Sequence, residues 1–330
     1  MPANLTQQYK DAEARFRAAA GHEEKLLALR EMIALLPKHK GTEKIHADLK
    51  RRLAHLEEEG EHAARSGGRH ADPGHVTREG AGQWILLGPP NSGKSSLLAA
   101  LTHAHPEIAD YPFTTHVPQP GMMAHEDVLV QLVDTPAVAA GHVDPWMPNL
   151  VRGGDGLVLV LDPSSEANET WPSELAGLLG RAHVWPGGRP LPPDASPLVE
   201  LRTTRVVFTR RDEDSDGTLA ALTAEIVGTD LPAFRVSART GEGLDALRAE
   251  LWRALRRVRV YTKEPGKKAE LERPFVLPEG ATVHELALHV HREMAERLRF
   301  ARIWGKARFD GQQVDRHHVL ADHDVVELHV

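Results

Sequence analysis

The sequence predicts an α/β fold in which a mostly parallel sheet has helices on both faces. Short apolar runs alternate with helical patterns from Gln83 to about Arg257, and this alternation is typical of parallel sheets covered by helices. Only helical periodicity precedes this region, and a mixed strand and helix pattern follows it. We therefore expect a helical region at 1–65, a flexible linker at 66–82, the α/β domain at 83–257 and a smaller α+β domain at 258–330.

The first 65 residues are expected to form three helices packed as a hairpin or small bundle. Pro37 ends the second helix and Thr42 caps the third. Apolar residues recur at helical spacing in all three. They are Leu5, Tyr9, Ala12 and Phe16, then Leu26, Leu29, Ile33 and Leu36, and finally Ile45, Leu49, Leu53 and Leu56.

Basic residues gather around the start of the third helix. They are Lys38, Lys40, Lys44, Lys50, Arg51 and Arg52. A solvated helix face and a phosphate-contacting RNA patch both account for such a cluster. The sequence leaves the two interpretations open.

Residues 66–82 are rich in glycine and polar side chains, which predicts a linker or mobile loop. Five apolar runs in the following region predict strands. These are Trp84–Leu87, Val128–Val133, Gly156–Leu161, Val206–Thr209 and Phe234–Val236. Ligands of such sheets bind beyond the carboxyl ends of the strands, so functional residues are expected just after these runs.

The C-terminal region 258–330 is predicted to combine strands with one helix. Thr282 and Glu285 form a capping box that opens this helix. Its apolar face contains Val283, Leu286, Val290, Met294 and Leu298. Strands are expected at Val258–Tyr261, Phe275–Leu277, Phe300–Trp304, Gln313–Val314 and Val325–Val330.

Composition excludes several kinds of chemistry. The 330-residue chain has no cysteine, which excludes disulfides, thiolate catalysis and cysteine-bound metals. Its 20 histidines lack metal-ligand spacing, so they are expected on the surface. The net charge of −7 disfavours indiscriminate nucleic-acid binding, and no DNA partner is expected.

No stretch approaches the ~20 apolar residues of a membrane span and the N-terminus is polar, so we expect a soluble, cytoplasmic protein without membrane contact.

Residues 88–95 read GPPNSGKS, a phosphate loop between a predicted strand and a predicted helix. In this motif backbone N–H groups converge on phosphate oxygens, and the helix N-terminus adds its positive dipole. Lys94 would neutralise charge between the terminal phosphates, and Ser95 offers a hydroxyl to magnesium. The pattern predicts a nucleoside triphosphate site. Its expected contacts are Gly88, Asn91, Ser92, Gly93, Lys94, Ser95 and Ser96.

Further segments occur in the order that a GTPase requires. Asp134 follows a strand, where its carboxylate can reach magnesium through water, and the preceding segment Tyr111–Thr115 offers a threonine to the metal and the γ-phosphate. Asp212 can accept from N1–H and the exocyclic amine of guanine, whereas adenine presents no matching pair of donors. The segment Ser237–Arg239 could cradle the base through backbone N–H groups. The expected base contacts are Thr209, Arg210, Asp212, Ser237, Ala238 and Arg239.

Together these motifs resemble the Obg/DRG branch of GTPases, and most of all the developmentally regulated GTP-binding (DRG) proteins. The likeness covers nearly the whole chain. Lys38–Glu43 resembles the basic helical leader of that family, and Ala109–Thr115 is similar to its first switch. Val260–Lys263 and Ala301–Gly305 resemble its TGS domain, a ubiquitin-like β-grasp module.

The resemblance implies a P-loop GTPase fold that binds GTP or GDP with Mg²⁺. Carried over by position, Ser95 and Thr115 would ligate magnesium, Asp134 would hold it through water, and Asp212 would read guanine. The residues expected to take part in catalysis are Lys94, Thr115 and Asn91.

Three departures from the family pattern bear on activity. Thr209 and Arg210 replace the Asn-Lys pair that opens the base motif, which would weaken guanine affinity, although the Arg210 stem could still pack over the purine. Ala137 replaces glycine in the second switch, so switching could be slow or damped. The family's inserted subdomain is missing, and only Trp185–Pro197 remains as a modest insertion.

The residue after Ala137 is Val138, so no glutamine stands there to orient an attacking water. The switch backbone at Thr115, a potassium ion or a partner would have to organise the water. Asn91 resembles the asparagine that helps to bind potassium in some GTPases. Alternatively, Asn91 braces the loop through its own backbone bonds.

We therefore expect a slow GTP-hydrolysing switch that is stimulated by K⁺. Its helical leader and TGS domain would engage the ribosome, structured RNA or a translation-related protein, by analogy with the family. Two alternatives remain. One is an ATPase of the same fold, against which Asp212 argues, and the other is a scaffold that holds nucleotide with little turnover, which the altered motifs at Ala137, Thr209 and Arg210 favour.

Overall fold

A computed structural model describes most of the chain. The described residues are 7–19, 22–37, 42–65, 76–102, 117–138, 143–191, 195–267, 269, 271, 273–305 and 309–330. The chain divides into two compact units. The first comprises Met1–His75, Asp144–Gly153 and Ala176–Arg202, and the second comprises Val76–Val143, Gly154–Leu175 and Thr203–Val330. No helix among the described residues is long and apolar enough to cross a membrane.

Three helices open the first unit: α1 (Gln7–Ala18), α2 (His22–Leu35) and α3 (Glu43–Arg65). The three predicted helices are thus confirmed. Their shared core consists of buried side chains from the predicted apolar faces and their neighbours. These are Tyr9, Ala12, Leu29, Met32, Leu36 and Leu49. Leu5, Lys38 and Lys40 lie outside the described residues.

The first unit also contains α5 (Met147–Gly153), the end of α6 (Trp171–Ala182) and β5 (Val184–Pro186). β5 pairs in parallel with Glu200–Arg202, the start of β6 (Glu200–Phe208). The sequence did not predict β5, because three residues beside a proline-rich segment give no strand pattern. It overlaps the start of the predicted insertion Trp185–Pro197.

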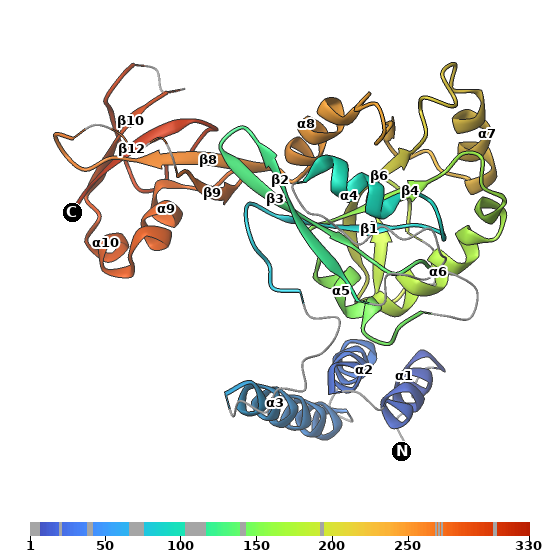
Figure 1. Ribbon diagram of the computed structural model, residues 1–330. Helices are drawn as coiled ribbons and strands as arrows, with labels where there is room; N and C mark the ends of the chain where they lie inside the picture. The colour runs from blue at the N-terminus through green and yellow to red at the C-terminus, as the bar shows by residue number, and fades with distance from the viewer. Residues whose placement is uncertain are drawn as a thin grey trace. The chain divides into compact units, whose positions relative to one another are not determined.

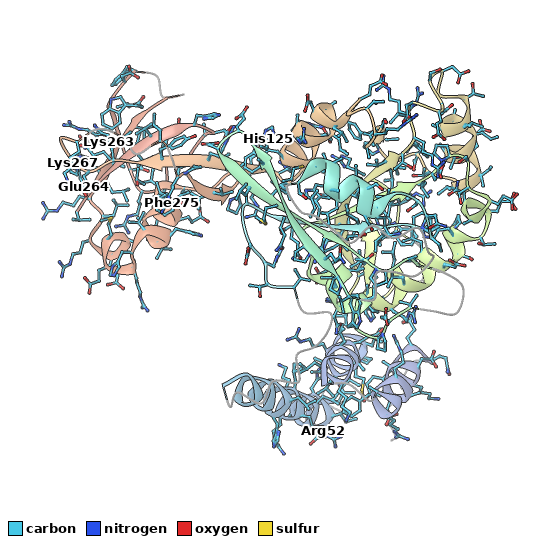
Figure 2. The ribbon with its side chains drawn as sticks, in the orientation of Figure 1. Arg52, His125, Lys263, Glu264, Lys267 and Phe275 are labelled. Carbon is cyan, nitrogen blue, oxygen red and sulfur yellow. The ribbon has the colours of Figure 1, made fainter. Side chains whose placement is uncertain are left out.

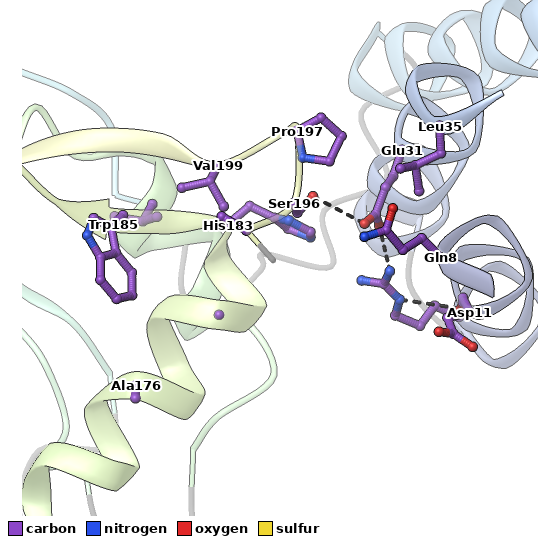
Figure 3. Close-up of a pocket in the computed structure, with 14 residues that line it drawn as sticks. Gln8, Asp11, Glu31, Leu35, Ala176, His183, Trp185, Ser196, Pro197 and Val199 are labelled. Atoms are coloured by element: carbon purple, nitrogen blue, oxygen red, sulfur yellow. Dashed lines mark hydrogen bonds and ion pairs between the residues drawn. The ribbon is translucent and has the colours of Figure 1, made fainter. Parts of the chain in front are cut away.

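A cavity of about 340 Å³ lies between α1, α2 and the β5 segment of this unit (Figure 3). Glu31 borders the cavity and is only 3% exposed. Its carboxylate lies 2.9 Å from the guanidinium of Arg15 and accepts a hydrogen bond of 3.2 Å from the hydroxyl of Ser196. These contacts compensate the buried charge, which would otherwise destabilise the unit.

The second unit is built on a mostly parallel sheet, as predicted. The strand order is β2-β3-β1-β4-β6, and β7 pairs with β6. β2 is antiparallel to β3, and the other pairs are parallel. The strands that complete this sheet are β1 (Gln83–Leu87), β2 (Gln119–His125), β3 (Val128–Asp134), β4 (Gly156–Leu161) and β7 (Ala233–Arg235).

Both faces of the central strand β1 are buried. Trp84 and Leu86 pack in one core with the apolar side chains of α4 (Lys94–Leu101) and α8 (Leu244–Ala254), which lie on the same face of the sheet (Figure 1). Ile85 and Leu87 are also fully buried. Because successive strand side chains point to opposite faces, both faces of β1 are covered, which is why the strand reads as a continuous apolar run. A further helix, α7 (Thr218–Val227), precedes β7.

Two features of this sheet were not predicted from the sequence. β2 reads QPGMMAH, and its proline and glycine conceal a strand that antiparallel pairing with β3 holds at the edge of the sheet. β6 begins at Glu200, whereas the sequence predicted a start at Val206. The prediction began too late because Leu201 is the only apolar residue from Glu200 to Arg205, so this part of the strand gives no apolar run.

Residues from Arg257 onward form a five-stranded sheet of order β11-β10-β12-β8-β9 with two helices. The elements are β8 (Arg257–Thr262), β9 (Phe275–Pro278), α9 (Val283–Val290), α10 (Arg292–Arg297), β10 (Phe300–Trp304), β11 (Gln312–Val314) and β12 (Asp324–His329). The predicted capping box at Thr282 and Glu285 is formed. Parallel pairing of β8 with β12 and a helical layer agree with the predicted β-grasp module.

The prediction of one continuous helix from Val283 to Leu298 was wrong. α9 ends at Val290, and His291 adopts an extended conformation with φ −166° and ψ 137°. The ring of His291 accepts a 3.3 Å hydrogen bond from the N–H of Glu293 and so caps the first turn of α10. Leu298 still reaches the core that contains Leu286, so the apolar spacing conceals the break.

Within the second unit, Arg259 of β8 links the β-grasp module to the turn between β2 and β3. Its guanidinium is buried, lies 3.0 Å from the Asp127 carboxylate and 2.7 Å from the Asp322 carboxylate, and also pairs with Glu126. It lies 5.3 Å from the centre of the Trp252 ring. The arginine therefore joins carboxylates from two sheets.

Candidate nucleotide-binding site

The predicted phosphate loop connects β1 to α4, and two of its glycines are required by geometry. A Cβ atom at Gly88 would lie 2.2 Å from the carbonyl oxygen of Val160, which is closer than atoms can approach. Gly93 has φ +91°, a conformation that side chains other than glycine rarely adopt. The loop can therefore pass close to β4 and turn sharply into the helix.

Lys94 opens α4 and is 7% exposed. Its ammonium group donates to the carbonyl oxygens of Gly88 at 3.1 Å and Pro89 at 3.0 Å. Burial lowers the pKa of Lys94 to about 8, and the nearby Asp134 carboxylate opposes this shift. An anion bound in the loop would stabilise the ammonium form, so the site favours phosphate groups.

Ser95 and Asp134 form a hydroxyl–carboxylate pair beside this lysine. The Ser95 hydroxyl donates to Oδ2 of Asp134 at 2.5 Å. Asp134 is fully buried, and its Oδ1 has no hydrogen-bond partner within the described part of the chain. Burial raises the pKa of Asp134, although the hydrogen bond from Ser95 opposes this effect. A hydroxyl and an unpartnered carboxylate oxygen are ligands that Mg²⁺ prefers, so these residues fit a magnesium site.

Asn91, another predicted residue of the phosphate loop, is placed differently from Lys94. Asn91 is exposed with φ 59°, and its side chain makes no hydrogen bond to any described residue. The backbone bracing suggested for Asn91 is therefore not seen there. Thr115 lies outside the described residues, so its proposed contact with magnesium stays a prediction.

Thr209 directly follows β6 and begins the segment Thr209–Asp212 that is predicted to contact the base. It connects this base segment to the phosphate loop. Its hydroxyl lies 3.0 Å from the carbonyl oxygen of Ser92 and 3.2 Å from that of Leu161. The next residue, Arg210, directs its guanidinium to Asp162, with Nε 2.8 Å from the carboxylate, and to Glu213. The charge of Arg210 is thus engaged by carboxylates.

Asp212 lies at the predicted base-reading position and is held by two neighbours. Hydrogen bonds from the Ser237 hydroxyl and the Arg239 guanidinium lower the pKa of Asp212. Nε of Arg239 lies 2.8 Å from Oδ2 of Asp212. The Ser237 hydroxyl also accepts a 3.1 Å hydrogen bond from the N–H of Thr240, which fixes the turn after β7.

One cavity of about 610 Å³ brings most of the predicted nucleotide contacts together. It is lined by Asn91, Gly93, Ser96, Ala99, Ala100, Thr209, Arg210, Asp212, Glu213, Ser237, Ala238 and Arg239. This volume and this combination of loop, carboxylate and backbone groups suit a nucleoside. Asp162, which holds Arg210, was not predicted, although its position directly after β4 is the usual place for a functional side chain in such a sheet.

The second switch leaves little room for a water-orienting side chain. Val138 is fully buried, and its N–H donates to the carbonyl oxygen of Gly88 at 3.2 Å. Ala137 is partly buried beside it. The position next to the phosphate loop is therefore occupied by the aliphatic side chain of Val138, which packs into the interior.

The fold and this site define the chain as a P-loop GTP-binding protein. Two family models match it: the 50S ribosome-binding GTPase model over residues 83–180 and the TGS domain model over residues 258–330. An uncharacterized GTP-binding protein of Halobacterium salinarum is 30% identical, and the alignment covers 93% of this chain and 99% of that protein. Developmentally-regulated G-protein 1 of Arabidopsis thaliana is 27% identical over 92% of this chain and 90% of its own length.

The chain belongs to the family of developmentally regulated GTP-binding (DRG) proteins. The resemblance inferred from its motifs is therefore confirmed, as are the P-loop GTPase fold and the C-terminal TGS domain.

Proposed function

We propose that the chain hydrolyses GTP to GDP and phosphate as a slow molecular switch. This proposal depends on the Ser95–Asp134 pair beside the buried Lys94. Together the three residues place an ammonium group next to a hydroxyl and a carboxylate that could bind a metal ion. Ser95, Asp134 and Thr115 would hold Mg²⁺, which would neutralise charge on the phosphate oxygens.

The residues of the chain would act mainly by positioning and charge stabilisation. Lys94 would balance the terminal phosphates, and the N–H groups of the loop would hold their oxygens. Asp134 is the only acidic residue that we assign to the phosphate end, and its carboxylate would be used to hold Mg²⁺. Because Val138 is buried and apolar, water activation by a side chain at that position is not available, which supports slow turnover.

Potassium stimulation is part of the same proposal. The Asn91 side chain is exposed and makes no hydrogen bond to the described residues, so its amide oxygen is available to a monovalent cation. A cation beside the phosphates would stabilise the charge that develops during hydrolysis. Turnover should be faster in KCl than in NaCl, and equal rates would remove potassium from the mechanism.

The proposed partner is the ribosome, structured RNA or a translation-related protein in the cytoplasm. The name of the matched GTPase family, 50S ribosome-binding GTPase, supports a ribosomal partner. On α3, Lys50, Arg51 and Arg52 are exposed. Arg52 (Figure 2) also pairs with Asp48 at 2.9 Å. These cations could contact phosphates.

A turnover assay with and without ribosomes tests the proposal. We expect slow phosphate release from GTP that ribosomes accelerate. A scaffold that holds GTP with little turnover is the second candidate, favoured by the buried Val138, and it predicts tight binding with no release under either condition. Preference for ATP over GTP in the same assay would instead favour the ATPase.

A further inference from the structure

The carboxylate predicted to read guanine is already engaged by Arg239. Nε of Arg239 lies 2.8 Å from Oδ2 of Asp212, and Nη2 donates to the same oxygen. A carboxylate oxygen has two lone pairs. Both lone pairs of Oδ2 are therefore used by one guanidinium.

Arg239 is far more exposed to solvent than Asp212, so its guanidinium lies on the solvent side of the carboxylate. The side chain of Arg239 is 72% exposed, whereas that of Asp212 is 12% exposed. Both residues line the 610 Å³ cavity. A ligand that enters from solvent therefore meets the guanidinium before it reaches the carboxylate.

Guanine cannot form its full pair of hydrogen bonds with this carboxylate while Arg239 occupies Oδ2. The base offers N1–H and an exocyclic amine side by side, and the parallel pair of hydrogen bonds uses one carboxylate oxygen for each donor. Oδ2 has no free lone pair in the observed arrangement. The guanidinium must leave before the pair of hydrogen bonds can form.

We propose that Arg239 is a latch over Asp212 that guanine must displace, so that Arg239 limits the affinity for guanine nucleotides. This inference rests on the proposed guanine recognition by Asp212. The apparent dissociation constant is the intrinsic one divided by the fraction of unlatched protein. Because exposed ion pairs are weak, the latch should reduce affinity about two- to fivefold.

Two features distinguish a latch from a general charge effect. Salt screens an exposed ion pair, so the effect of the latch should shrink as ionic strength rises. An adenine nucleotide held by its phosphates has no need of the Asp212 carboxylate, so the latch should leave its affinity unchanged. A mere loss of positive charge would alter both nucleotides.

Arg211 provides a matched control. It stands beside Asp212 in the sequence, but its guanidinium pairs with Glu242 at 2.9 Å. Like Arg239→Gln, Arg211→Gln removes one positive charge near Asp212, but it leaves the Arg239–Asp212 pair in place.

The test is titration of nucleotide-free, full-length protein with GDP and with ADP at low and high salt. Relative to Arg211→Gln, Arg239→Gln should bind GDP about two- to fivefold more tightly at low salt and less so at high salt, with ADP unchanged. Equal or weaker GDP binding by Arg239→Gln would overturn the latch, as would the same gain in Arg211→Gln.

Asp212→Asn separates failure of the latch from failure of guanine recognition. If this variant loses the preference for GDP over ADP while Arg239→Gln shows no gain, Asp212 reads guanine but Arg239 does not latch it. If Asp212→Asn keeps the preference, guanine recognition by Asp212 is wrong and the latch falls with it.

Discussion

The hydroxyl of Thr209 lies 3.0 Å from the main-chain carbonyl oxygen of Ser92, so the base segment is tied directly to the phosphate loop. Thr209 is buried, and the same hydroxyl lies 3.2 Å from the carbonyl oxygen of Leu161. Thr209, which stands where the base motif of the family has asparagine, thus keeps a polar link between the two halves of the proposed nucleotide site.

Removing this hydroxyl should weaken both the fold and the site. Thr209→Val preserves the shape of the side chain but leaves the buried carbonyls of Ser92 and Leu161 without this donor. We expect the free energy of unfolding to fall by about 1–2 kcal/mol, with weaker nucleotide binding, as measured by urea denaturation and nucleotide titration. Thr209→Ser retains the hydroxyl and should behave like the natural protein. Equal stability of the valine variant would show that the link contributes nothing.

The Ser95–Asp134 pair predicts the magnesium dependence of nucleotide binding. Ser95→Ala removes one proposed metal ligand. The Mg²⁺ concentration needed for half-maximal GTP binding should therefore rise by about tenfold or more. Titration of GTP binding with MgCl₂ measures this change. Ser173→Ala is the control, because it removes a hydroxyl of α6 that donates to the Thr170 carbonyl. An unchanged magnesium requirement in Ser95→Ala would contradict the assigned metal site.

Arg259 predicts a contribution to stability that is independent of nucleotide. Arg259→Met would leave the carboxylates of Asp127 and Asp322 without their guanidinium. Since these carboxylates are partly exposed, we expect a loss of about 2 kcal/mol in the free energy of unfolding. Urea denaturation of the nucleotide-free protein measures it. Arg256→Met, which breaks only an exposed pair with Glu279, should change stability far less.

The same cluster predicts a dependence on pH. The hydrogen bond from Arg259 lowers the pKa of Glu126, and at Asp322 burial opposes ionisation but the hydrogen bonds from Arg259 outweigh it. A carboxyl group whose folded pKa is depressed stabilises the fold above its ordinary pKa, and this contribution is lost as pH falls through the folded value. The stability difference between the natural protein and Arg259→Met should therefore narrow below about pH 4. A difference that stays constant from pH 6 to pH 3 would contradict this origin.

The sequence predicted the features that are encoded locally. The phosphate loop is contiguous over residues 88–95, and Asp134 and Asp212 each follow an apolar run, so the topology of a parallel sheet brings them to one edge. The central strands were predicted for the same reason, since burial on both faces makes them uniformly apolar.

Features that depend on tertiary contacts could not be predicted. β2 contains proline and glycine and is held by pairing with β3. The break at His291 depends on a side-chain cap inside an unbroken apolar spacing. The pair formed by Asp212 and Arg239 joins residues that lie far apart in sequence, and only the arrangement of two loops brings them into contact.

The most direct test of the central claim is calorimetric titration of nucleotide-free protein with GTP and ATP in the presence of Mg²⁺. The protein should take up GTP in preference to ATP, Lys94→Ala should bind neither, and Asp212→Asn should lose the preference. Failure of the natural protein to take up GTP at millimolar concentrations with magnesium would contradict the assignment of this cavity as a guanine nucleotide site.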